Sequence, residues 1–125
     1  MATIRITNLK LRTIIGVNEW ERDLKQDVVI NISLTYDAAK ASKSDNLKDT
    51  IDYKAITKKI IKMVEASNFL LLEKLADIIL QIVLDDPRVK EATVRVDKPL
   101  ALRFADSVSV ELTKKQKWVI PRLLA

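Results

Sequence analysis

Two segments near the start of the chain alternate apolar and polar residues, which is the period of a β-strand. The first covers residues 3–15 and has one slip in its alternation near Asn8, whereas the second, residues 28–36, alternates without a slip. Successive side chains of a strand point to opposite faces of a sheet, so both segments predict half-buried strands, the first with a β-bulge. The polar residues 18–26 between them predict a hairpin with a long loop.

The middle of the chain has the helical period instead. From Asp52 onward, apolar residues recur three and four positions apart until Ser67-Asn68 interrupts the pattern. A second helical segment, residues 71–83, is apolar over a wide arc and stops at Asp85-Asp86-Pro87. The carboxylate of Asp52 can accept from the free N–H groups of the first helical turn. Residues 37–50 are small, polar and charged, and they predict a connection without an element of its own.

Two more alternating segments, residues 92–97 and 107–112, end the pattern. The order ββααββ predicts an α+β fold in which a four-stranded antiparallel sheet carries two helices on one face. A chain of 125 residues is one domain by length. We therefore predict a single domain over residues 1–113, followed by a basic tail over residues 114–125.

Composition restricts the chemistry that this domain can perform. The chain has no Cys and no His, which excludes disulfides, thiolate ligands and the commonest ligand of zinc, so we expect no metal site. Any proton chemistry therefore falls to lysine, tyrosine or carboxylate. The N-terminus shows no signal sequence and the chain has no apolar run long enough to cross a membrane, so we expect a cytoplasmic protein without a membrane partner.

The net charge of +5 depends on the last part of the chain. Without the four basic residues that follow Glu111, the charge would be +1. Aromatic residues make up only 5% of the chain and do not alternate with basic ones, as a base-stacking surface requires. We therefore interpret the tail as a solvated terminus and expect no nucleic-acid partner.

Lys98 is the best-placed candidate for proton chemistry. It ends a predicted strand, and Pro99 keeps its backbone extended. A lysine that is partly withdrawn from water at such a position can act as a base, although a loop lysine taken alone is usually solvated. Tyr53, at the first turn of the first helix, and Glu21, in the long hairpin loop, have ordinary interpretations as surface side chains.

Glu73 stands out because it lies in the most apolar helix, close to its N-terminus. The helix dipole alone would favour a carboxylate there. The alternative is that this carboxylate receives two parallel N–H donors from a planar, guanidine-like edge. The aminopyrimidinone rings of guanine and pterins have such an edge.

Several of these motifs together resemble the dihydroneopterin aldolase family. The similar segments are Asp97-Lys98-Pro99 with residues 101–109 (ALRFADSVS), and Leu71-Leu72-Glu73-Lys74-Leu75, in the order ββααββ. Residues 101–109 and 9–16 (LKLRTIIG) are most similar to the dihydroneopterin triphosphate 2′-epimerase branch. Residues 16–21 (GVNEWE) and 40–45 are more similar to the aldolase branch, and Leu100 replaces a histidine found in many epimerase-like chains. Both activities therefore stay open, with the epimerase favoured.

The resemblance implies the T-fold, in which four subunits join their sheets into a barrel. It further implies that two such rings stack into a homo-octamer with active sites between adjacent subunits. The chemistry that it implies is a retro-aldol cleavage of the side chain of a pterin substrate. Neither a metal nor an organic cofactor takes part. Re-addition of the aldehyde gives the 2′-epimer, and its release gives 6-hydroxymethyl-7,8-dihydropterin and glycolaldehyde.

The resemblance also assigns a role to each candidate residue. Glu73 is expected to anchor the pterin ring, with the backbone of Leu72 beside it. Lys98 corresponds to the catalytic lysine and Tyr53 to the tyrosine of the site, where it can relay a proton and contact the substrate. Glu21 corresponds to the glutamate of the long hairpin loop, where it is expected to act in catalysis and to bind the substrate, and it is expected to come from the adjacent subunit.

Overall fold

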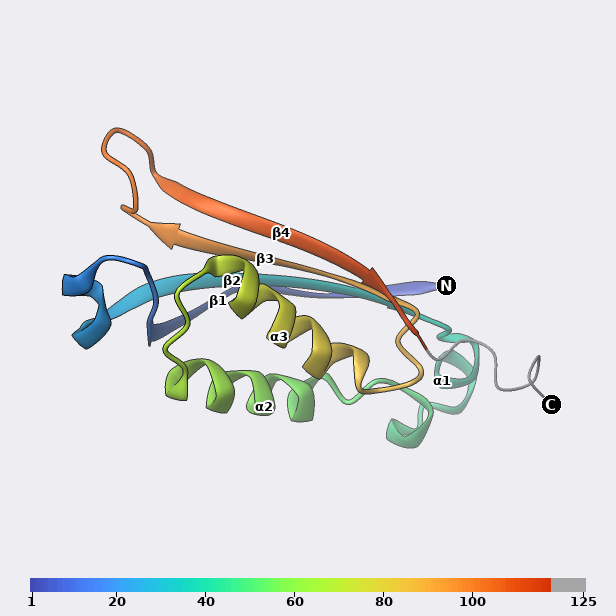
Figure 1. Cartoon of the computed structure of the whole chain (residues 1–125). Helices are drawn as coiled ribbons and strands as arrows, with labels where there is room; N and C mark the ends of the chain where they lie inside the picture. The colour runs from blue at the N-terminus through green and yellow to red at the C-terminus, as the bar shows by residue number, and fades with distance from the viewer. Residues whose placement is uncertain (118–125) are drawn as a thin grey trace.

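The computed structural model describes residues 1–117 of the chain. Its four strands form one antiparallel sheet in the order β1-β2-β3-β4, and α2 and α3 pack on one face of it (Figure 1). The elements are β1 (Ala2–Ile14), the 3₁₀ helix η1 (Glu19–Asp23), β2 (Lys25–Tyr36), α1 (Ala39–Ser44), the 3₁₀ helix η2 (Leu47–Asp49), α2 (Tyr53–Ala66), α3 (Leu72–Leu84), β3 (Glu91–Pro99) and β4 (Ser107–Lys115). This arrangement confirms the predicted α+β fold.

Two local features form as the sequence predicts. The register between β1 and β2 shifts between Ile6 and Leu9, and Asn8 has a φ of 54°, so the slip in the alternation is a β-bulge. The side chain of Asp52 accepts a hydrogen bond of 3.0 Å from the backbone N–H of Ala55, which caps α2.

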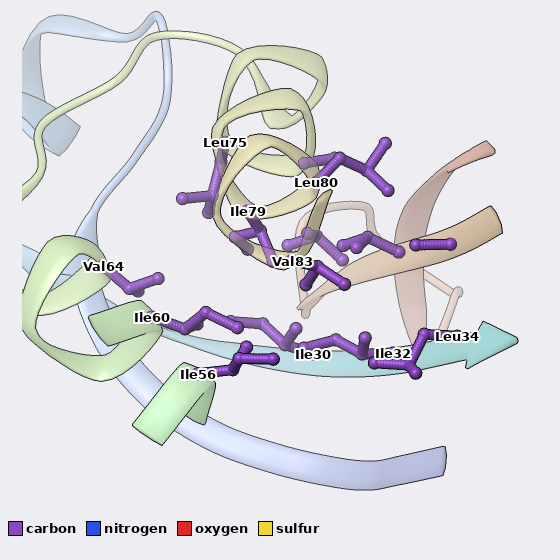
Figure 2. Close-up of a cluster of buried hydrophobic side chains, with 14 of the residues drawn as sticks. Ile30, Ile32, Leu34, Ile56, Ile60, Val64, Leu75, Ile79, Leu80 and Val83 are labelled. Carbon is purple, nitrogen blue, oxygen red and sulfur yellow. The ribbon is translucent and has the colours of Figure 1, made fainter. Parts of the chain in front are cut away.

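The core lies between the sheet and the two long helices. Alternate residues of β2 and β3 face α2 and α3, whose apolar stripes cover them (Figure 2). Ile30, Ile60 and Ile79 are among the core side chains without exposed surface. Burying a side chain of this size stabilises the fold by roughly 1.5–3 kcal/mol. The wide apolar arc of α3 is therefore explained by packing alone.

Two predictions about boundaries are wrong. Residues 37–50 do not form a plain connection, since they contain α1 and η2, which are too short to show a helical period in sequence. The folded domain also extends beyond residue 113. β4 runs to Lys115, and the buried side chain of Gln116 donates to the carbonyl oxygens of Leu84, the last residue of α3, and of Asp86 and Val89 in the connection that follows it. The rest of the predicted tail, residues 118–125, lies outside the described residues.

The connections β1–β2 and β3–β4 lie at the same end of the sheet, while α1 lies at the opposite end (Figure 1). The α2–α3 connection is joined to the β1–β2 connection, because the N–H of Gly16 donates to the carbonyl oxygen of Phe69 over 3.3 Å. Three connections that are far apart in the sequence therefore meet at one end of the sheet. No described helix is long and apolar enough to cross a membrane.

Candidate active site

Lys98 is the next-to-last residue of β3, and its side chain shares the helix-facing side of the strand with Val94 and Val96. Only 13% of the side chain is exposed. Its ammonium group forms an ion pair with the carboxylate of Glu21 in η1. The lysine is therefore partly withdrawn from water and fixed in direction.

Glu21 is the most deeply buried charged group of the described chain, with 2% of its surface exposed. Besides Lys98, its carboxylate accepts from the backbone N–H of Asn18 at 3.1 Å, from the Asn18 side chain at 2.8 Å and from Gln26 at 2.9 Å. Burial alone would raise the pKa of Glu21. The hydrogen bonds from Lys98, Gln26 and Asn18 outweigh burial and lower the pKa from 4.5 to about 2. Glu21 is therefore an anion at neutral pH.

Gly16 makes room for this carboxylate. A Cβ atom at this position would overlap the carboxyl group of Glu21, and the φ of 133° is one that residues with a Cβ rarely adopt. Gln26 adds a second support, since its amide also donates to the carbonyl oxygen of Ile15 at 3.0 Å. Sequence reasoning assigned no role to Gly16 or Gln26, although the position of the chain's only glycine just before the long loop is a signal that could have drawn attention to Gly16.

Glu73 and Leu72 begin α3. The residue before the helix, Leu71, provides no side-chain cap, so N–H groups of the first turn stay available to a ligand. Glu73 is exposed, whereas Leu72 is partly buried against the core. Both residues thus lie at one helix start, and their role in holding a pterin stays a prediction.

Tyr53 is the first residue of α2 and is 59% exposed. No hydrogen bond or ion pair within residues 1–117 joins Tyr53 or Glu73 to Lys98 or Glu21. The structure thus brings two of the predicted residues, Lys98 and Glu21, into contact, and leaves Tyr53 at the start of α2 and Leu72 and Glu73 at the start of α3. Glu21 and Lys98 meet within one chain, and the expectation that Glu21 also reaches the site of an adjacent subunit stays a prediction.

No group of three or more carboxylates that could hold a metal ion occurs within residues 1–117. The chemically distinctive feature of the site is instead the buried pair of Glu21 and Lys98, whose loop is hydrogen-bonded to the connection that leads to Glu73. Such an arrangement can move a proton at one point of a substrate while a carboxylate holds another part of it.

The arrangement of strands and helices identifies the structural class of the protein. A four-stranded antiparallel sheet with two helices on one face, in the order ββααββ, is the T-fold. A mutant urate oxidase of Bacillus sp. TB-90 superposes with a TM-score of 0.69 over 91% of this chain and 46% of that chain. At 13% identity, this likeness shows the fold alone.

The chain belongs to the dihydroneopterin aldolase family, whose sequence pattern matches residues 4–113. The dihydroneopterin triphosphate 2′-epimerase of Pseudomonas aeruginosa is 48% identical over 90% of this chain and 91% of that protein. The dihydroneopterin aldolase of Escherichia coli is 31% identical over 88% of this chain and 90% of that protein. A crystal structure of the E. coli aldolase in complex with neopterin superposes with a TM-score of 0.87 at 30% identity, covering 91% of this chain and 99% of that chain. These findings confirm the family and the fold that the sequence motifs predict.

Proposed function

We propose that the protein is a dihydroneopterin triphosphate 2′-epimerase, which interconverts 7,8-dihydroneopterin triphosphate and 7,8-dihydromonapterin triphosphate. The observation that carries the chemistry is the buried ion pair of Lys98 and Glu21 in a member of this family. The choice of epimerase rests on the higher identity to the epimerase relative, 48% against 31% for the aldolase.

The pterin ring binds at the start of α3. The carboxylate of Glu73 accepts from the amino group and the ring N–H of the pterin, and the backbone of Leu72 lies beside the same edge. Two parallel hydrogen bonds to an ionised carboxylate fix the ring plane as well as its position. The exposed Glu73 and the uncapped first turn of α3 support this assignment.

The reaction breaks and re-forms the C1′–C2′ bond of the substrate. Lys98, acting through a bound water, helps to remove the proton of the 2′-hydroxyl. The C2′ carbon becomes an aldehyde, and the electron pair of the broken bond passes to C1′ and into the C6=N5 unit of the dihydropterin. Re-addition to the other face of the aldehyde inverts C2′. The substrate is its own electron sink, so the route needs no metal and no organic cofactor.

Glu21 supports Lys98 and does not itself take the proton. A carboxylate with a pKa of about 2 is too weak a base to remove a hydroxyl proton near neutral pH. Its negative charge and its position hold the Lys98 side chain at the site. Glu21 is thus a positioning residue in this proposal, a narrower role than the catalytic and substrate-binding one expected from the resemblance.

Tyr53 joins the site as a proton relay and substrate contact from a neighbouring copy of the chain. Its exposure within one chain supports this arrangement, as do the edges of β1 and β4, which are unpaired within residues 1–117 and allow sheets to join. Large apolar side chains are also exposed in the two loops beside the site, at Val17, Trp20, Leu24, Leu100, Leu102 and Phe104. We therefore expect a homo-octamer of two tetrameric rings in the cytoplasm. Sedimentation velocity tests this state, and a monomer at micromolar concentration would contradict it.

The triphosphate needs cations near Lys98. Arg12 is already paired with Asp27 at 3.4 Å and donates to a backbone carbonyl, and Lys54 lies in the first turn of α2. Arg103 belongs to the loop that follows Lys98, and its guanidinium lies 5.5 Å from the centre of the Phe104 ring without a carboxylate partner among the described residues. We assign the triphosphate contact to Arg103.

The alternative activity is that of a dihydroneopterin aldolase, favoured by the loop motif at residues 16–21. One assay separates the two. The protein is incubated with dihydroneopterin or its triphosphate, the mixture is oxidised, and monapterin is resolved from 6-hydroxymethylpterin by chromatography. We expect monapterin triphosphate as the main product of the triphosphate. Hydroxymethylpterin as the dominant product of the unphosphorylated substrate would favour the aldolase, and no turnover of either substrate would overturn both.

A further inference from the structure

The guanidinium of Arg22 ties the β1–β2 loop to the α2–α3 connection. Its Nη1 donates to the carbonyl oxygens of Gly16 at 2.7 Å and of Phe69 at 3.2 Å, and its Nη2 donates to the carbonyl oxygen of Asn68. These three acceptors are backbone groups of two different connections. The planar arginine side chain can reach several acceptors at once, which a lysine ammonium at a single point cannot do with the same geometry.

The two connections that Arg22 joins carry the two halves of the proposed site. Arg22 directly follows Glu21, whose carboxylate holds Lys98, and it contacts Gly16, whose missing side chain makes room for that carboxylate. On the other side, Asn68 and Phe69 belong to the connection that leads into α3, whose first residues are Leu72 and Glu73. Arg22 therefore links the loop that carries Glu21 to the connection that leads to Glu73.

We propose that Arg22 is a positioning residue that sets the spacing between the Lys98–Glu21 pair and the Glu73 anchor. This inference rests on the proposed function. The dihydropterin ring is rigid, so a ring held by Glu73 presents its C1′–C2′ bond at a fixed distance from that anchor. Lys98 reaches the 2′-hydroxyl only if the two connections keep their spacing, and a misplacement of about 1 Å can lower a rate by on the order of 100-fold.

The same spacing governs the fate of the cleaved aldehyde. Re-addition requires the aldehyde to stay beside C1′ until the new bond forms, whereas a loosened site lets it leave. Escape of the aldehyde leaves C1′ to be protonated and yields 6-hydroxymethyl-7,8-dihydropterin. Arg22 thus acts on the ratio of the two products as well as on the rate.

The test compares wild type, Arg22→Ala and the control Arg88→Ala. Arg88 also donates to a backbone carbonyl, that of Lys48 at 3.1 Å, but belongs to the connection between α3 and β3. With dihydroneopterin triphosphate, we expect Arg22→Ala to lower kcat on the order of 10- to 100-fold. Pterin binding, measured by fluorescence, should change little, because Glu73 is intact. The fraction of hydroxymethyl product should rise in Arg22→Ala and stay at the wild-type value in Arg88→Ala.

A general loss of folded protein would lower both products equally, so a changed product ratio separates positioning from stability. If Arg22→Ala does not fold, Arg22→Lys is measured instead, with a smaller change of the same sign expected. A wild-type rate and product ratio in the folded variant would overturn the role of Arg22 while leaving the epimerase intact. Wild-type protein that binds pterin but turns over neither substrate would overturn the proposed function itself.

Discussion

The two halves of the candidate site differ in how complete they are within one chain. The carboxylate of Glu21 is buried and accepts hydrogen bonds from three residues, and its partner Lys98 is only 13% exposed. Glu73 and Tyr53, in contrast, lie exposed at two helix starts and make no described contact with that pair. The half that moves the proton, Lys98 with Glu21, is already formed in the free chain. The half that binds the ring, with Glu73 and Tyr53, is exposed to solvent.

This difference follows from the chemistry of each half. A proton-transfer group has to be held in direction and sheltered from water, which requires neighbours from the same fold. A binding group has to exchange its water for a ligand, so its hydrogen-bonding capacity cannot be used up inside the protein. The comparison predicts that substitutions in the first half change rate and stability, whereas substitutions in the second half change affinity.

The largest effect is expected for Lys98→Ala, which should lower turnover of dihydroneopterin triphosphate by roughly 10²–10⁴-fold, the usual contribution of a general base. Pterin binding should persist, because Glu73 is unchanged. Stopped-flow kinetics and fluorescence titration measure the two quantities. Lys114→Ala is the matched control, since it also breaks an ion pair, that with Asp77. Turnover in Lys98→Ala equal to that of wild type would refute the role of the lysine.

Glu21→Gln should change the acid stability of the protein. The folded-state pKa of Glu21 is depressed from 4.5 to about 2, so its stabilising contribution is complete above pH 4.5 and is lost as the pH falls toward 2. That difference corresponds to roughly 3 kcal/mol of unfolding free energy. Urea unfolding of wild type and Glu21→Gln at pH 7 and pH 3 measures it. We expect the variant to be less stable at pH 7 and to lose less stability on acidification. Parallel pH profiles would contradict the buried ion pair.

Glu73→Gln should weaken pterin binding by about 10- to 100-fold, because hydrogen bonds to a charged acceptor contribute roughly 1.5–3 kcal/mol. The rate of the bound substrate at saturation should change much less. Titration calorimetry with neopterin and saturation kinetics provide the two values. The control is Glu65→Gln, an exposed carboxylate near the end of α2. A lowered kcat with unchanged affinity would show that Glu73 acts in the reaction and not in pterin binding.

Arg103→Ala should have the smallest effect and the most selective one. An exposed charge contact with phosphate contributes roughly 1 kcal/mol, so KM for the triphosphate should rise about fivefold. KM for unphosphorylated dihydroneopterin should stay the same. Arg5→Ala provides the comparison, because Arg5 is also exposed but lies in β1, away from the loop after Lys98. An equal rise for both substrates would place Arg103 outside the triphosphate contact.

Local patterns in the sequence predict the sheet, the two long helices and the cap at Asp52. The buried pair was not predictable in this way, because Glu21 and Lys98 are 77 residues apart and the loop glutamate looks like any solvated carboxylate. Its burial depends on the space left by Gly16 and on the supporting amide of Gln26. The short elements α1 and η2 were missed for a different reason, since fewer than two turns give no measurable period.

The central claim is that Lys98 assists cleavage and re-formation of the C1′–C2′ bond, and turnover in D₂O tests it most directly. On this route, the hydrogen on C2′ stays in place throughout, because only the hydroxyl proton and the C1′–C2′ bond are exchanged. Mass spectrometry of the monapterin product should therefore find no deuterium at C2′ after washing into H₂O, and Lys98→Ala should form almost no epimer. Deuterium at C2′ of the epimer would show direct proton abstraction from that carbon and would contradict the account.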